Sequence, residues 1–286
     1  MDVLRQVRPS VLYIAADGPR PNKPGEAEAC KETRQEADQV DWPCRVEKLY
    51  REENRGIRHG IPEAITWFLE QEGRGIILED DCLPAVDFFP FASALLDYYE
   101  DDSRVMHING SNFQPFEPTS GSPSYYFSRY NHGWGWATWK RAWDTFDLEM
   151  HNLESFLSQA RAITFWDSPK EEIYWKKVLT QTQKGEIATW DYQWNFALWN
   201  HNGLAVTPFV NLISYMGFGD GATNTTHATG GAQEIPHGTI GQLLHPMSIE
   251  RNKTLDQKNF FRMYWGSPKE RLIAKLRKLR KVLFPL

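Results

Sequence analysis

The chain has 286 residues, of which 24% are charged, and its formal net charge is -5. This length suits one large domain or two small ones, and the modest negative charge argues against a general nucleic-acid binder. No apolar run approaches the roughly 20 residues that a membrane-spanning helix needs, and residues 1–5 do not resemble a signal peptide. The three cysteines, Cys30, Cys44 and Cys82, fit neither a zinc site nor a disulfide framework, which favours the cytoplasm.

The first 110 residues alternate between predicted strands and predicted helices. Apolar or alternating runs predict strands at residues 11–16, 45–50, 76–78 and 105–108. Helical periodicity lies between them, at residues 26–40, 57–70 and 87–99. This alternation favours a mostly parallel sheet with helices on its faces. Ligands bind such sheets beyond the carboxyl ends of the strands.

Three consecutive carboxylates, Glu79, Asp80 and Asp81, follow the predicted strand at 76–78. Like charges this close repel, and a chain does not bury them without a partner. Carboxylates at the carboxyl end of a strand commonly hold a divalent cation against a phosphate-bearing ligand. The alternative is a solvated acidic turn after a buried strand.

The second half of the chain is aromatic. Nine of the 12 tryptophans lie between Trp134 and Trp199. Indole rings fill protein cores well, but they also stack against sugar rings, so the cluster suggests a carbohydrate or another flat ligand. Further elements are predicted as helices near 138–143, 170–182 and 192–201, a strand at 204–206 and a mobile loop at 217–231.

The C-terminal stretch has the pattern of a basic amphipathic helix. Its leucines share one helical face, and lysines and arginines surround them: the leucines are Leu272, Leu276, Leu279 and Leu283. Such a helix can lie on an anionic membrane surface. The alternative is a helix packed on the domain with its charges in solvent.

Three segments together resemble glycosyltransferases of the GT-A fold. Residues 75–84 (GIILEDDCLP), followed by Asp87-Phe88-Phe89, resemble the metal-binding segment of that family. The pattern is similar to the N-acetylglucosaminyltransferase I type and to bacterial nucleotide-diphospho-sugar transferases. Residues 133–136 (GWGW) resemble the segment that lines the donor and acceptor pocket, and residues 189–194 (TWDYQW) the segment that carries the catalytic base. Over roughly residues 9–230, the resemblance implies an α/β protein of GT-A fold with a mostly parallel central sheet flanked by helices.

The resemblance gives each acidic residue a role. Asp81 would bind the divalent metal, manganese or else magnesium, while Asp80 would reach the ribose and Glu79 the donor sugar. Asp17, after the strand at 11–16, would face the uracil edge of the nucleotide; a plain turn residue is the alternative. Asp191 would be the general base, against the alternatives of a helix cap at that position or a different base, Asp167.

The implied pocket includes Gly133, Trp134 and Trp136. His227, in the loop at 217–231, would touch the diphosphate or the metal when that loop closes. The chain departs from the family at its start, because relatives begin with a further strand and helix. Residues 1–8 correspond only to the tail of that helix, so the first strand and part of the base pocket are expected to be missing.

These observations predict a metal-dependent inverting glycosyltransferase. A bound cation would neutralise the leaving diphosphate, one carboxylate would deprotonate the acceptor hydroxyl, and direct displacement would invert the anomeric carbon. A sugar nucleotidyltransferase is one alternative, although no glycine-rich phosphate loop follows the first predicted strand. A non-catalytic carbohydrate-binding protein is the other.

The predicted organisation is one fused domain in three parts. Residues 1–130 would bind the nucleotide sugar and the metal, residues 131–240 would bind a glycan or lipid-linked acceptor, and residues 241–286 form a tail. No nucleic-acid partner is expected. The basic helix of the tail would bring a cytoplasmic protein to the inner face of the plasma membrane.

Overall fold

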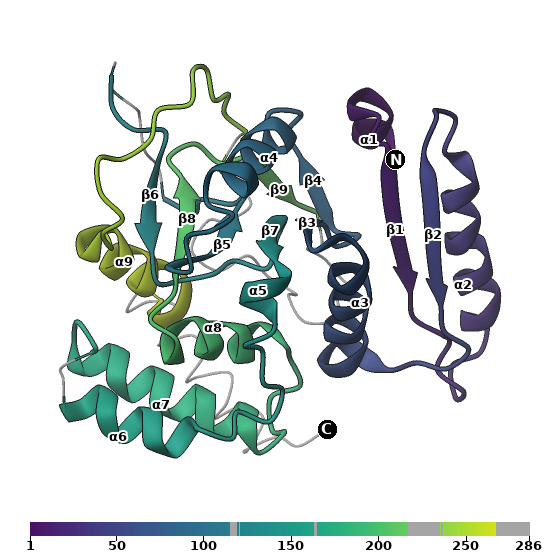
Figure 1. The fold of residues 1–286 in the computed structure, drawn as a ribbon. Coiled ribbons are helices and arrows are strands. Elements are labelled where there is room, and N and C mark those ends of the chain that lie inside the picture. Colours follow the sequence, from purple (N-terminus) through teal and green to yellow (C-terminus); the bar gives the residue numbers. More distant parts are fainter. Residues whose placement is uncertain (115–118, 120, 163–164, 217–234, 236, 267–286) are drawn as a thin grey trace.

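The computed structural model describes residues 1–114, 119, 121–162, 165–216, 235 and 237–266. Its main sheet has five strands in the order β3-β7-β5-β8-β6 (Figure 1). In chain order they are β3 (Arg74–Ile77), β5 (Val105–Asn109), β6 (Tyr125–Ser128), β7 (Trp136–Trp139) and β8 (Leu204–Pro208). Only β5 and β8 pair in parallel, and the other three pairings are antiparallel.

The prediction of a mostly parallel GT-A sheet is therefore wrong. β3 and β5 do run in the same direction, but β7 lies between them and pairs antiparallel with both. The sequence predicts a helix from residue 138, whereas all four residues of β7 are buried in the sheet and α5 (Lys140–Trp143) begins only after it. The strands and helices of the first half alternate as predicted. The antiparallel character comes from β6 and β7, short aromatic strands without a helical crossover.

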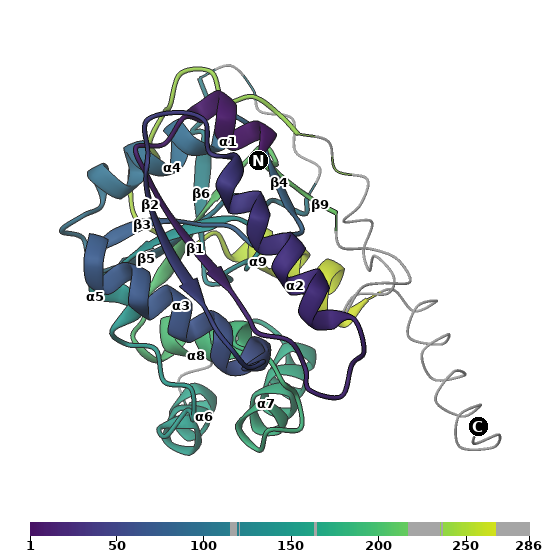
Figure 2. The ribbon, with the colours of Figure 1, turned by 90° about the vertical axis from the view of Figure 1, so that its right-hand side faces the viewer.

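A second, two-stranded sheet stands apart from the main one. β1 (Val11–Ala16) and β2 (Arg45–Tyr50) pair in parallel. Figure 1 shows α3 (Gly56–Glu72) between this pair and the five strands of the main sheet. Figure 2, seen from that side, shows α2 (Glu26–Gln35) lying along the pair. Two shorter elements complete this part: α1 (Asp2–Val7) and the 3-10 turn η1 (Glu36–Gln39). The strand predicted at 11–16 thus exists but does not join the central sheet.

A side chain of α3 contacts both sheets. The Phe68 ring lies 5.2 Å from the ring of Tyr13 in β1, centroid to centroid. The same ring packs on Gly75 of β3, where an added Cβ would approach it to 2.4 Å. A larger residue at position 75 would therefore push Phe68 out of this contact.

The two faces of the main sheet carry two separate hydrophobic cores. α4 (Phe88–Tyr98) covers one face, against residues such as Ala137 and Val206. Helices α3, α5, α6 (Leu153–Ala162), α7 (Pro169–Gln183) and α8 (Asp191–Asn200) contribute to the core of the other face. Because side chains of a strand alternate between faces, Trp136 enters the second core and its neighbour Ala137 the first.

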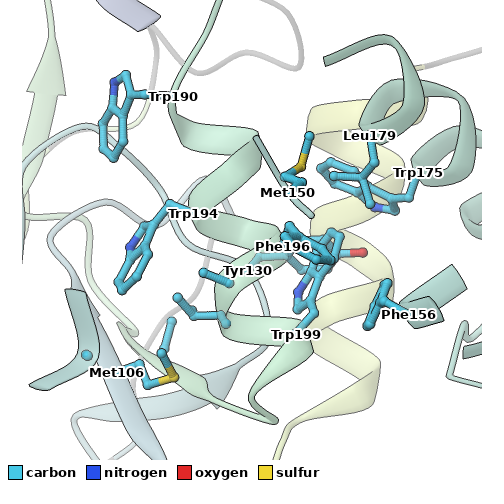
Figure 3. Close-up of a cluster of buried hydrophobic side chains, with 14 of the residues drawn as sticks. Met106, Tyr130, Met150, Phe156, Trp175, Leu179, Trp190, Trp194, Phe196 and Trp199 are labelled. Carbon is cyan, nitrogen blue, oxygen red and sulfur yellow. The ribbon is translucent and has the colours of Figure 1, made fainter. Parts of the chain in front are cut away.

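Helix α8 runs through the second core. Every residue from Gln193 to Trp199 is buried, as expected for a helix surrounded by other elements. Figure 3 shows Trp190 and Trp194 on one side of it and Phe196 and Trp199 on the other. The helix is thereby fixed in position, and so is Asp191 at its start.

Four short elements complete the fold. β4 (Cys82–Pro84) pairs antiparallel with β9 (Ile213–Tyr215). α9 (Lys253–Asn259) continues into the π-helical turn η3 (Phe260–Trp265). The Asn252 side chain caps α9 by accepting a hydrogen bond from the backbone of Leu255 at 3.1 Å, as N-cap residues do.

The strands of both predicted halves interleave in the main sheet, because β7 and β8 lie among β3, β5 and β6.

Within the described residues, no helix is long and apolar enough to cross a membrane. The leucines of the predicted basic helix, residues 272–283, lie outside the described residues, as does His227.

Candidate functional site

The acidic triplet forms the turn between β3 and β4. The backbone amide of Cys82 donates to the carbonyl of Glu79 at 3.1 Å, which closes the turn. The backbone amide of Met216 donates to the Asp81 carbonyl at 2.7 Å, so the chain after β9 holds the turn from the other side. Of the three carboxylate residues, Asp80 is exposed and the other two are half-buried.

Asp191 is the first residue of α8, and its side chain is held from several directions. Its carboxylate accepts a hydrogen bond from the Thr189 hydroxyl. Backbone amides of Asp191 and Tyr192 also bond to it. The carbonyl of Thr189 accepts a hydrogen bond from the Gln193 side chain at 2.8 Å, which closes the turn before the helix. The carboxylate is thus oriented before any ligand binds.

The triplet, the glycine segment and Asp191 meet in one place. An added Cβ on Gly133 would lie 3.7 Å from Glu79 Oε1 and 3.4 Å from the Trp190 ring. Gly133 therefore lies between the acidic turn and the start of α8. The charges of Asp81, Asp191 and Asp80 all act on Glu79. Three segments that are far apart in the sequence thus build one acidic site.

Burial and mutual repulsion raise the pKa values in this site. Burial, and then the charges of Asp81, Asp191 and Asp80, raise the pKa of Glu79 to about 8. Burial also raises the pKa of Asp81, although hydrogen bonds from Tyr215 and Cys82 oppose that rise. Burial raises the pKa of Asp191, against its hydrogen bond from Thr189. Carboxylates gathered in this way favour either protons or a cation.

The oxygen donors of the turn suit a hard divalent cation. No group of three His, Cys, Asp or Glu side chains among the described residues is arranged to hold a metal by itself. A cation at Asp81 would need further oxygens from water or from phosphate groups, which is how Mg²⁺ and similar ions bind at phosphate-transfer sites. The described side chains thus do not form a complete metal site, and a cation shared with a ligand stays a prediction.

Asp17 lies at the N-terminus of α3. Its carboxylate accepts hydrogen bonds from the backbone amides of Arg55 and Gly56, both at 2.9 Å, and from Gly18 at 3.2 Å. These bonds satisfy amides at the start of the helix. Because β1 is not part of the main sheet, Asp17 and the triplet do not share a sheet edge. Its contact with a nucleotide base stays a prediction.

Most of the clustered tryptophans are core residues. Seven of the nine are buried: Trp136, Trp139, Trp143, Trp175, Trp190, Trp194 and Trp199. Trp136, expected in the pocket, is 0% exposed and stacks under Trp190 at 5.6 Å. Trp134 is half-buried and stacks on Tyr215 at 4.2 Å. Of the two predicted pocket tryptophans, only Trp134 is accessible to a ligand. Trp136 is buried and packs against Trp190.

Asp167, the alternative base, is bound in an ion-pair network. It accepts hydrogen bonds from Arg129 at 2.8 Å and from Arg251. Arg129 also pairs with Glu171 at 2.7 Å, and Arg251 pairs with the buried Asp256. The Asp167 carboxylate is thus engaged by two guanidinium groups of this network. The assignment of Asp191 as the base stays a prediction.

Tyr215 is a site residue that the sequence does not single out. It lies in β9 in register with Cys82, and it forms a side-chain hydrogen bond with Asp81. β9 is only three residues long, so no periodic pattern marks it, and its pairing with β4 is a long-range contact.

No protein-family model matches this chain, and no curated protein is significantly similar to it.

Proposed function

We propose that this protein is a metal-dependent inverting glycosyltransferase. It would move a sugar from a nucleotide-diphosphate donor to a hydroxyl of a glycan or lipid-linked acceptor. The observation that supports this most is the meeting of the Glu79–Asp81 turn with Asp191 across Gly133. The resemblance of the three segments to glycosyltransferases adds to it.

Asp191 is suited to deprotonate the acceptor. As the acceptor oxygen bonds to the anomeric carbon, the bond from that carbon to the diphosphate breaks and the hydroxyl proton passes to Asp191. A base is most effective when its pKa lies near the working pH, and burial moves the pKa of Asp191 in that direction. With one base facing one leaving group, the anomeric configuration inverts.

The acidic turn is suited to hold the donor. Asp81 would bind the divalent ion, which when bound neutralises charge on the diphosphate, and Asp80 would reach the ribose. Glu79 would hydrogen-bond a hydroxyl of the donor sugar from its place beside Gly133.

Calorimetry and product analysis test the proposal. With Mn²⁺ present, the wild-type chain should bind uridine diphosphate and hydrolyse at least one nucleotide sugar from a panel. Asp81→Ala should lose Mn²⁺-dependent binding, whereas Asp191→Asn should keep binding and lose transfer. Asp101→Asn, at an exposed aspartate outside the site, is the matched control. Absence of turnover with every donor by the folded protein would refute the enzyme assignment.

A second candidate is a non-catalytic carbohydrate-binding protein. It is favoured by the lack of a complete metal-ligand set among the described residues. In that case the protein should bind glycans equally well without Mn²⁺ and after Asp81→Ala. The same calorimetry therefore separates the two candidates.

A further inference from the structure

Two polar side chains of β5 are buried in the core that contains α8. His107 and Asn109 are both 0% exposed, and residues two apart in a strand lie on the same face of the sheet. His107 Nε2 lies 2.8 Å from Asn109 Oδ1, while His107 Nδ1 lies 3.0 Å from Nε1 of Trp194 in α8. The His107 ring also stacks on Trp136 at 4.7 Å, centroid to centroid. This polar pair therefore connects β5 to α8.

The chemistry of the groups fixes the direction of each bond of His107. The indole nitrogen of Trp194 can only donate, so His107 Nδ1 is the acceptor. The single ring proton then lies on Nε2 and is donated to Asn109 Oδ1. Burial lowers the pKa of His107 to about 3, so the ring stays neutral in this arrangement.

Asn109 is the centre of the network. Its Oδ1 accepts from His107 and from the backbone amide of His132, the latter at 2.6 Å. Its Nδ2 donates to the Tyr130 carbonyl at 3.1 Å and to the Thr207 hydroxyl at 2.9 Å. These are the two accepted and two donated bonds that one amide can make. A carboxylate of the same shape would lack both donors, and an apolar side chain would lack all four bonds.

The network fixes residues 130–132 against the start of α8. Asn109 bonds the backbone on both sides of Asn131. The Asn131 amide in turn donates to the side-chain oxygen of Asn195 at 3.2 Å, and its side chain donates to the Asp191 carbonyl at 3.5 Å. Asp191 and Asn195 are four residues apart, so they lie on one face of the helix. Residues 130–132 thus join β5 to the part of α8 that carries Asp191.

The next residue along the chain is Gly133, at the acidic turn. An added Cβ there would lie 3.7 Å from Glu79 and 3.4 Å from Trp190. Any shift of residues 130–132 would therefore move Gly133 relative to Asp191. Because Asn109 is 0% exposed, its effect on a ligand has to pass through these neighbours.

We propose that Asn109 is a positioning residue, which sets the spacing between Gly133 at the acidic turn and Asp191. This inference rests on the proposed function, because it takes Asp191 as the base. The reaction needs the donor sugar and the base at a fixed separation, and a displacement of about 1 Å can cost about a hundredfold in rate. Asn109 itself neither touches the substrate nor takes up a proton.

A neutral variant of similar size tests this role. Asn109→Leu should lower kcat for transfer about a hundredfold and leave the calorimetric affinity for uridine diphosphate with Mn²⁺ unchanged, because that ligand carries no sugar. Asn112→Leu is the matched control. Asn112 is 2% exposed and donates to the carbonyls of Pro208 at 2.9 Å and Phe209 at 3.0 Å, so its loss should lower the melting temperature similarly and spare transfer. An equal fall in kcat in both variants, or a parallel loss of diphosphate binding, would overturn the proposal.

The bond directions can be measured on the wild-type chain. Long-range ¹H–¹⁵N NMR should show His107 as the neutral Nε2–H tautomer at pH 5, in keeping with its lowered pKa. An Nδ1–H tautomer or a protonated ring would turn an N–H toward the indole N–H of Trp194. Either result would remove the basis of the network and overturn the proposal.

The resonances of Gly133 give a readout that needs no turnover. The Trp190 ring lies beside this glycine and affects the chemical shifts of its α-protons. These shifts should change in Asn109→Leu and stay in place in Asn112→Leu. Asn109→Ser, whose smaller side chain leaves room for a water at the freed polar groups, should show the change if Asn109→Leu does not fold.

The outcomes separate this inference from the proposed function. If the wild-type chain turns over no donor but the Gly133 shifts change, the glycosyltransferase assignment fails and the control of Gly133 by Asn109 stands. If the Gly133 shifts are the same as in the wild type in the folded Asn109 variants, or change equally in Asn112→Leu, the positioning role is refuted.

Discussion

Glu79 connects the chemistry of the site to its pH response. Its pKa rises from the ordinary value of 4.5 to about 8 on folding, through burial and three neighbouring carboxylates. A carboxyl whose folded pKa exceeds its unfolded pKa contributes stability below the unfolded value, and that contribution is lost as the pH rises through the folded value. The site therefore favours folding in mild acid and opposes it in mild base.

We expect the melting temperature to fall between pH 5 and pH 8 in the absence of metal. Glu79→Gln, which resembles the neutral acid, should melt above wild type at pH 8 and close to it at pH 4.5. Mn²⁺ should recover part of the wild-type loss at pH 8, because a cation favours the ionised turn. Thermal denaturation across this pH range measures all three. A parallel fall in wild type and Glu79→Gln would show that Glu79 is not the group responsible.

Thr189 should tune the proposed base. Its hydroxyl bonds to the Asp191 carboxylate and opposes the rise in pKa that burial causes. Thr189→Val should therefore raise that pKa further and move the acidic limb of the kcat/KM profile up by roughly one pH unit, the size of one hydrogen bond to a charge. Thr189→Ser should restore the profile. A drop in activity without a shift along the pH axis would contradict this role.

Gly133 should set the space between the acidic turn and α8. A Cβ at this position meets Glu79 and Trp190 at ordinary contact distances, so Gly133→Ala should fold while its methyl group narrows the proposed donor site. We expect donor binding to weaken at least tenfold by calorimetry, with little change in melting temperature. Gly241→Ala is the control, since a Cβ there has no neighbour within 4 Å. Normal donor affinity in Gly133→Ala would place the donor elsewhere.

At the scale of elements, an ion-pair network attaches α7 and the segment around α9 to β6. Arg129 is 3% exposed and pairs with Asp167 and with the buried Glu171. Removing one partner of a buried ion pair leaves an uncompensated charge, which costs about 3–5 kcal/mol. Arg129→Met should lower the free energy of unfolding by that amount in chemical denaturation. Arg104→Met, which breaks an exposed pair with Asp102, should cost less than about 1 kcal/mol.

The sequence predicts elements well where their pattern is local. The strand at 11–16 and the helices near 57–70 and 170–182 form within a few residues of their predicted bounds. β7 was missed because its extended conformation depends on pairing with β3 and β5. No local pattern distinguishes a fully buried strand from a buried helix. The fold class failed for the same reason, since β7 makes two antiparallel pairings and β6, which was also not predicted, makes the third.

The candidate site was more predictable than the sheet that carries it. The acidic triplet, Gly133 and Asp191 were all chosen from the sequence, and the structure brings them together. The sequence does not show that Trp136 is buried and Trp134 is not, because the burial of Trp136 depends on its packing against α8. Tyr215 reaches the site through a contact between distant segments, which a single sequence does not display.

At the scale of the whole molecule, the separate sheet should be the least stable part of the described fold. A two-stranded sheet is only marginally stable by itself, and no residue of β1 or β2 is buried, whereas every residue of β5 and β6 is. Amide hydrogens of β1 and β2 should therefore exchange at least tenfold faster than those of β5 and β6. Equal protection in the two sheets would show that they unfold as one unit.

Phe68 contacts both sheets. If the two sheets nevertheless open separately, the protein does not unfold as one cooperative unit. If the first fifty residues open without the main sheet, the acidic turn and Asp191 keep their places and only the surroundings of Asp17 are lost. A ligand that contacts both regions would then link two units that otherwise open separately. Its binding would slow the hydrogen exchange of the backbone amides in β1 and β2.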